Sequence, residues 1–117
     1  MRIHHLALRV SDLERSRAFY SDLLGLVEVE RFAEEGRLRS IWLRAGDALL
    51  MIESRLRGCG ADSGSAHLLA FEVDDLERWE RRLAEAGIPV DDRSASTLYC
   101  RDPEGHRVGL TVFPRRG

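Results

Sequence analysis

The sequence contains no lysine, asparagine or glutamine, and it has no long apolar run. All 18 of its basic residues are therefore arginine. Either a GC-rich genome or a high growth temperature would produce this bias, since amide side chains are thermally labile. No apolar stretch approaches the ~20 residues that a membrane-spanning helix needs, so we expect no membrane partner. Residues 1–5 lack the apolar core of a signal peptide, and we expect a cytoplasmic location.

Cysteine is scarce, with only Cys59 and Cys100 in the chain. The dense disulfide framework of a small secreted domain is therefore excluded, and two free thiols are expected. No serine or cysteine has an evident base beside it, and the glycines match no phosphate-binding loop, which argues against nucleophilic catalysis. The net charge is −2 and the arginines are spread along the chain, so no nucleic-acid partner is expected.

One phrase occurs twice in the sequence, as HHLALRVSDLER over residues 4–15 and as HLLAFEVDDLER over residues 67–78. Eight of the twelve aligned pairs are identical. Such a repeat predicts two copies of one supersecondary unit that stack to complete a core. Two of the mismatched pairs are His5/Leu68 and Arg9/Glu72.

The length of 117 residues predicts a single domain, 1–117, made of both copies. Module one is expected over residues 1–54 and module two over residues 67–114. Between them, residues 55–66 are rich in glycine, serine and alanine, which is typical of a linker.

Each copy reads as a strand, a helix and three further strands. The strand predicted over residues 3–10 is followed by Ser11, which with Glu14 makes a capping box, and the helix is expected to end at Gly25. In the second copy, Asp74 and Glu77 repeat the cap, and Trp79 falls on the apolar stripe of the helix and is expected in the core. The further strands are predicted over residues 26–32, 38–44, 48–53, 90–93, 97–101 and 106–113.

Three phrases in this order resemble the vicinal oxygen chelate superfamily: Ile3 to Gly25, His67 to Leu76 and Tyr99 to Leu110. That group includes glyoxalase I, bleomycin resistance proteins, extradiol dioxygenases and fosfomycin resistance enzymes. The resemblance implies an α+β fold in which two tandem βαβββ modules form a curved mixed-sheet half-barrel around a shared cavity. It also implies a homodimer and a small organic molecule as ligand.

Metal-binding members of that superfamily hold a divalent ion at four positions, on the first and last strand of each module. The matching positions here are His5, Met51, Leu68 and Gly109. Only the histidine can ligate the hard divalent metals of the family, because methionine sulfur is too soft and the other two side chains carry no donor. Three protein ligands are the usual minimum for a catalytic metal. We therefore expect a degenerate metal site and no cofactor.

A strand bulge that turned His67 inward would leave an alternative. In that case a divalent metal would bind at a shifted site formed by His5, Glu53 and His67. The repeat argues against this alternative, because His67 aligns with His4 and not with His5.

The other candidates are side chains that strand alternation directs into the expected cavity. Trp42 and Tyr99 would supply apolar walls, and His5 would orient a ligand or act as a general acid or base. Arg9 and Glu72 would form an ion pair across the modules, or Arg9 would bind an anion. The predicted ligand-binding set is His5, Arg9, Trp42, Met51, Glu53, Leu68, Glu72 and Tyr99, and no residue is assigned as catalytic.

The sequence thus favours a small-molecule-binding protein with its ligand in an apolar cavity between the modules. One alternative is a metal-dependent glyoxalase-like lyase or isomerase, or an extradiol-type dioxygenase, that uses the shifted site. Another is a dimeric regulatory partner with a filled cavity.

Overall fold

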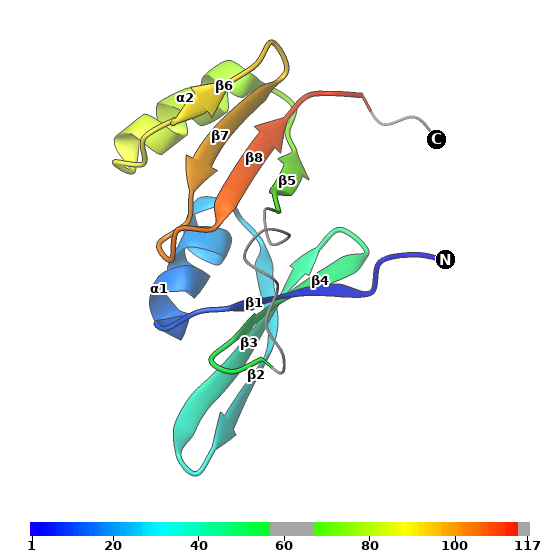
Figure 1. Ribbon diagram of the computed structural model, residues 1–117, viewed down its shortest axis with the longest axis vertical. Helices are drawn as coiled ribbons and strands as arrows, with labels where there is room; N and C mark the ends of the chain where they lie inside the picture. The colour runs from blue at the N-terminus through cyan, green and yellow to red at the C-terminus, as the bar shows by residue number, and fades with distance from the viewer. Residues whose placement is uncertain (57–66, 115–117) are drawn as a thin grey trace. The chain divides into compact units, whose positions relative to one another are not determined.

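The computed structural model describes residues 1–56 and 67–114, which fall into two compact units on either side of residue 60 (Figure 1). Most of the predicted linker, Cys59 included, lies outside the described residues. Each unit contains the predicted order of one strand, one helix and three strands. This confirms the α+β class and the two tandem βαβββ modules. No helix in the described ranges is long and apolar enough to cross a membrane.

The first unit is a four-stranded sheet of order β1-β4-β3-β2, in which β1 runs parallel to β4 and the other pairs are antiparallel. A long β2–β3 hairpin forms one side of this sheet (Figure 1). The helix α1 continues directly into a π-helical turn, η1. The elements are β1 (His5–Arg9), α1 (Leu13–Arg17), η1 (Ala18–Leu23), β2 (Val27–Glu34), β3 (Arg37–Ala45) and β4 (Ala48–Glu53).

The second unit repeats this topology in a sheet of order β5-β8-β7-β6, with β5 parallel to β8. Its helix α2 contacts β7 and β8 (Figure 1). The elements are β5 (Leu69–Glu72), α2 (Leu76–Glu85), β6 (Asp92–Arg93), β7 (Thr97–Arg101) and β8 (Arg107–Thr111). The internal repeat of the sequence therefore corresponds to a repeat of structure.

Strand alternation gives each sheet one face that packs on its helix and one that points away from it. In the first unit the side chains packed toward α1 include Leu8, Ile41 and Ile52, all at most 3% exposed. In the second unit Cys100 and Val108 are fully buried toward α2. We call the opposite side of each sheet its far face. It carries His5, Ala7, Arg9, Phe32, Ser40, Trp42, Met51 and Glu53 in the first unit and Leu68, Ala70, Glu72, Thr97, Tyr99, Arg107 and Gly109 in the second.

Both helix caps lie one residue later than predicted. Asp12, not Ser11, is the N-cap of α1, and its carboxylate accepts a hydrogen bond of 3.1 Å from the backbone of Arg15. Asp75, not Asp74, is the N-cap of α2. A carboxylate reaches the second or third backbone N–H of the helix from this position. The capping-box prediction is wrong at Glu14 for the same reason, and its carboxylate has other partners.

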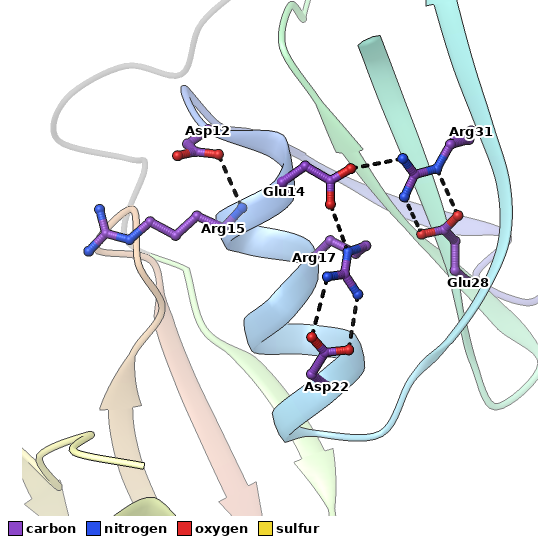
Figure 2. A network of polar contacts seen from close by, with 7 residues as sticks. All are labelled: Asp12, Glu14, Arg15, Arg17, Asp22, Glu28 and Arg31. Carbon is purple, nitrogen blue, oxygen red and sulfur yellow. Dashed lines mark hydrogen bonds and ion pairs between the residues drawn. The ribbon is translucent and has the colours of Figure 1, made fainter.

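Those partners form a chain of alternating charges that joins α1 and η1 to β2 (Figure 2). Glu14 accepts from Arg17 at 2.9 Å and from Arg31 at 2.8 Å. Arg17 also donates to Asp22, and Arg31 forks onto Glu28 through bonds of 2.8 and 2.7 Å. Hydrogen bonds from Arg17 and then Arg31 hold the pKa of Glu14 below its usual value of 4.5. Arg31 lowers the pKa of Glu28 in the same way.

The turn between β7 and β8 is built on Asp102, which is 5% exposed. Its carboxylate accepts hydrogen bonds from the backbone of Glu104 at 2.9 Å and of His106 at 2.8 Å. Gly105 has a φ of 90°, a conformation that costs glycine little. The predicted Asp-Pro-Glu-Gly turn is therefore present as a structural element.

Candidate functional site

His5 is exposed at the start of β1, on the far face of the first sheet. Its Nδ1 lies 2.9 Å from Nδ1 of His4, and the two rings are nearly perpendicular. One ring must donate in this contact and the other accept, so in the neutral pair one Nε2 carries a proton and the other does not. His5 can therefore hydrogen-bond a ligand, and its neighbour influences which tautomer it adopts.

The other three metal positions carry no oxygen or nitrogen donor. Met51 lies opposite Ala7 on one side and Trp42 on the other, and it is 8% exposed. A Cβ at Gly109 would meet Thr97 Cγ2 at 3.4 Å, Leu68 Cδ1 at 3.5 Å and Ala70 Cβ at 3.6 Å. The far face of the second sheet is thus packed with carbon around the position that a ligating side chain would occupy.

The residues of the shifted metal site are not brought together within a unit. Glu53 pairs with Arg9 in the β1–β4 register, while His5 pairs with Leu49. Four residues of strand separate the two positions, or about 13 Å. His67 lies before β5 with its ring centroid 6.1 Å from that of His106, beside the β7–β8 turn. Within residues 1–56 and 67–114, no three His, Cys, Asp or Glu side chains form a group that could hold a metal ion.

Aromatic and apolar side chains cluster in the middle of the first far face. The rings of Phe32 and Trp42 lie 4.9 Å apart, and the Trp42 indole donates a 2.8 Å hydrogen bond to Ser40. Phe32 is 43% exposed and Trp42 is partly buried, so this aromatic pair presents apolar surface while the indole N–H is satisfied. Sequence reasoning missed Phe32, although its place opposite Ser40 follows from the hairpin register.

Tyr99 holds the corresponding place in the second sheet, opposite Gly109. The guanidinium carbon of Arg107 lies 4.3 Å from the centre of the Tyr99 ring, and Arg107 Nη2 donates to Asp92 at 3.3 Å. A cation at this distance over an aromatic face is attracted by the ring. Sequence reasoning missed Arg107, although its alternation with Gly109 along β8 would have placed it on this face.

Arg9 and Glu72 occupy equivalent register positions in their own sheets, opposite Glu53 and Thr111 respectively. Both are exposed. The ion pair between them stays a prediction. Within the first unit, the Arg9–Glu53 register alone already places opposite charges on neighbouring strands of one face.

Two residues with reactive or aromatic side chains lie outside the site. Cys100 is fully buried, and burial, reinforced by Asp91 and Asp102, raises the pKa of its thiol to about 11. The thiol is therefore protonated near neutral pH and is a poor nucleophile.

Trp79 is only partly buried, with the guanidinium of Arg82 5.3 Å from its ring, so the prediction that it belongs to the core is wrong.

Paired βαβββ units of equal topology define a recognisable class of α+β proteins. The chain belongs to the Glyoxalase/Bleomycin resistance protein/Dioxygenase superfamily, whose family model matches residues 2–110. Glutathione transferase FosA of Serratia marcescens is 32% identical, over 94% of this chain and 79% of that protein. Lactoylglutathione lyase of Neisseria meningitidis is 31% identical, over 92% of this chain and 88% of that protein. The crystal structure of lactoylglutathione lyase from Agrobacterium tumefaciens is 25% identical with a TM-score of 0.72, covering 94% of this chain and 92% of that one.

Proposed function

We propose that this protein binds a small organic molecule on the far faces of its sheets and holds no resident metal. The observation that carries the proposal is the chemistry of the four metal positions, which are His5, Met51, Leu68 and Gly109. A single imidazole supplies one of the three protein ligands that a catalytic divalent ion requires. The residues present do not fit such an ion.

The strand registers support this proposal. Glu53 is about 13 Å along the sheet from His5, whereas two ligands of one metal ion must bring their donor atoms within about 2 Å of it. Leu68 fills space next to Gly109 where a donor from β8 would stand. The face is therefore suited to apolar contact rather than to coordination.

Binding would come from apolar surface, with polar side chains setting the orientation of the ligand. Trp42, Met51, Leu68 and Tyr99 supply the apolar contacts. His5, Arg9, Glu53 and Glu72 supply hydrogen bonds and charge.

Metal analysis of protein purified without chelators tests the proposal directly. We expect Ni, Zn, Mn and Fe well below one ion per chain, and the same content in the His5→Ala variant. A stoichiometric metal that is lost on His5→Ala would overturn it. Exposed Asp47→Ala, on the β3–β4 turn, serves as the matched control for adventitious surface binding.

A second candidate function is that of an enzyme, because two proteins similar to this chain are named as enzymes. A glutathione transferase and a lactoylglutathione lyase match most of this chain at 31–32% identity. A glyoxalase-like lyase or isomerase, or an extradiol-type dioxygenase, would need the shifted site of His5, Glu53 and His67 to converge on a metal, and the β1–β4 register counts against this for His5 and Glu53. Metal-dependent turnover of a hemithioacetal or a catechol, abolished by Glu53→Gln, would support the enzyme over the binding protein.

We also propose that the protein works in the cytoplasm and, as the family resemblance implies, as a homodimer. Light scattering after size-exclusion chromatography would then report twice the chain mass of 13.3 kDa. A mass of one chain at micromolar concentration would contradict the dimer.

A further inference from the structure

Four charged side chains line a depression of about 370 Å³ at one end of the second sheet: Asp91, Asp92, Arg101 and Arg107. Two are carboxylates and two are guanidiniums, so the lining is neutral in sum but presents both signs of charge. Tyr99 adjoins it, because the Arg107 guanidinium lies over the Tyr99 ring. A depression lined in this way is suited to a ligand that itself carries both charges.

The ion pairs in this depression are weakly held. Arg101 Nε donates to Asp91 at 3.2 Å, and Arg107 Nη2 donates to Asp92 at 3.3 Å, each through one hydrogen bond. The fork of Arg31 on Glu28, by contrast, has two bonds of 2.8 and 2.7 Å. Exposed, monodentate pairs contribute little to stability, so a ligand's charges can replace these partners at small cost.

Arg107 makes both a ring contact and an ion pair. A guanidinium has five N–H donors, and within the described part of the chain one of them makes the bond to Asp92. Its guanidinium carbon also lies 4.3 Å from the centre of the Tyr99 ring, a distance at which the ring attracts the cation. The remaining donors belong to a planar guanidinium, a group that can bind a carboxylate through two bonds.

The apolar part of the same far face begins two residues further along β8. Gly109 follows Arg107 by two positions, about 7 Å, and the side chains of Leu68, Ala70 and Thr97 lie 3.4–3.6 Å from the place that a Cβ at Gly109 would take. This spacing fits a molecule of amino-acid size, with its charged end at Arg107 and its apolar group over Gly109.

We infer that the ligand is a small zwitterion with an apolar substituent, such as a free amino acid. Its anionic group would bind the Arg107 fork and its cationic group the carboxylates of Asp91 and Asp92. This inference rests on the proposed binding function and names the class of molecule bound.

Three probes with the same phenyl group and different charges test it: L-phenylalanine, phenylacetate and 2-phenylethylamine. We expect calorimetry to show that the purified protein binds L-phenylalanine at least about tenfold more tightly than either singly charged probe. Arg107→Met keeps the length of the side chain and removes its charge, so it should bring the affinity for L-phenylalanine down to that for 2-phenylethylamine. Asp92→Asn should reduce it toward that for phenylacetate.

The control is Arg81→Met, an exposed arginine on α2, which should leave all three affinities unchanged. Thermal unfolding without ligand shows whether each variant is folded. Equal affinities for the three probes, no binding of L-phenylalanine at millimolar concentration, or an Arg107→Met variant that binds like the parent would each overturn the inference.

The two proposals fail separately. A protein with a stoichiometric metal that still prefers the zwitterion would overturn the proposed metal-free binding function and keep this inference. A metal-free protein that binds phenylacetate as tightly as L-phenylalanine would do the reverse.

Discussion

Arg31 on β2 donates a hydrogen bond of 2.8 Å to Glu14, which lies seventeen residues earlier on α1. The same guanidinium forks onto Glu28 of its own strand. A single arginine therefore connects the edge strand of the first sheet to the helix that packs on that sheet. The contact is exposed, so its effect on stability is small and depends on pH and salt.

The first prediction concerns that pH dependence. Hydrogen bonds from Arg17 and Arg31 depress the pKa of Glu14 in the folded protein below 4.5, so its stabilising contribution is complete above that value and is lost as the pH falls through the depressed pKa. Glu14→Gln should lower the Tm by a few degrees at most at pH 7, and this difference should vanish in strong acid. Thermal scans of both proteins between acid and neutral pH measure it. Glu30→Gln is the control, and a difference that grew on acidification would contradict the assignment.

The second prediction concerns the N-cap of α2. The Asp75 carboxylate accepts from the backbone of Glu77 at 3.0 Å and of Arg78 at 3.3 Å. Asp75→Ala should therefore destabilise the protein by about 1 kcal/mol. Asp74→Ala removes only an exposed ion pair with Arg78 and should have a smaller effect. Urea unfolding distinguishes the two variants, and an equal or reversed order would show that Asp75 is not the cap.

The third prediction separates packing from binding. Leu83 is 0% exposed and Leu68 is 41% exposed. Leu83→Ala should cost about 2–5 kcal/mol, because it leaves a cavity under α2. Leu68→Ala should change the free energy of unfolding little and weaken ligand binding instead. Chemical unfolding and calorimetry on the same samples provide the measurements, and a Leu68→Ala variant that is strongly destabilised would assign this residue to the core.

The fourth prediction restores the missing donors. A variant that combines Met51→Glu, Leu68→His and Gly109→Glu would have a donor at each of the four metal positions, together with His5. It should take up about one Zn or Mn ion per chain, whereas the proposed function predicts no such uptake by the parent. Metal content after dialysis measures this uptake, and adding His5→Ala to the combination should reduce it. A folded variant that takes up no metal would show that these positions do not converge.

Much of the fold could be predicted because the sequence contains two copies of the same strand and helix pattern. The bounds of β4 and β7 agree with prediction, since each strand is closed by turn residues on both sides. The caps were misplaced by one residue because Ser11 and Asp12 are both good cap formers. The identical pair Asp12/Asp75 in the repeat was the available signal, whereas Ser11/Asp74 differ.

The candidate site was less accessible to sequence reasoning. The family resemblance singled out both Leu68 and Gly109, and Leu68 lies next to the place that a Cβ at Gly109 would take. Strand alternation could not foresee that the Arg107 guanidinium would lie over the Tyr99 ring, since a long side chain can take many directions from one position. Trp79 was misassigned because a helical stripe predicts direction and not depth of burial, and here arginine stems flank the ring.

The division of each sheet into two faces also matters for engineering. Leu8, Ile41 and Ile52 maintain the fold of the first unit from one side, while neighbouring positions such as His5 and Arg9 point away from it. A mutant library confined to exposed far-face positions, such as His5, Arg9 and Glu72, would therefore sample new binding chemistries with little loss of foldable clones. The same separation means that the second copy of the repeat can change at Leu68 and Glu72 while its helix-facing core stays the same.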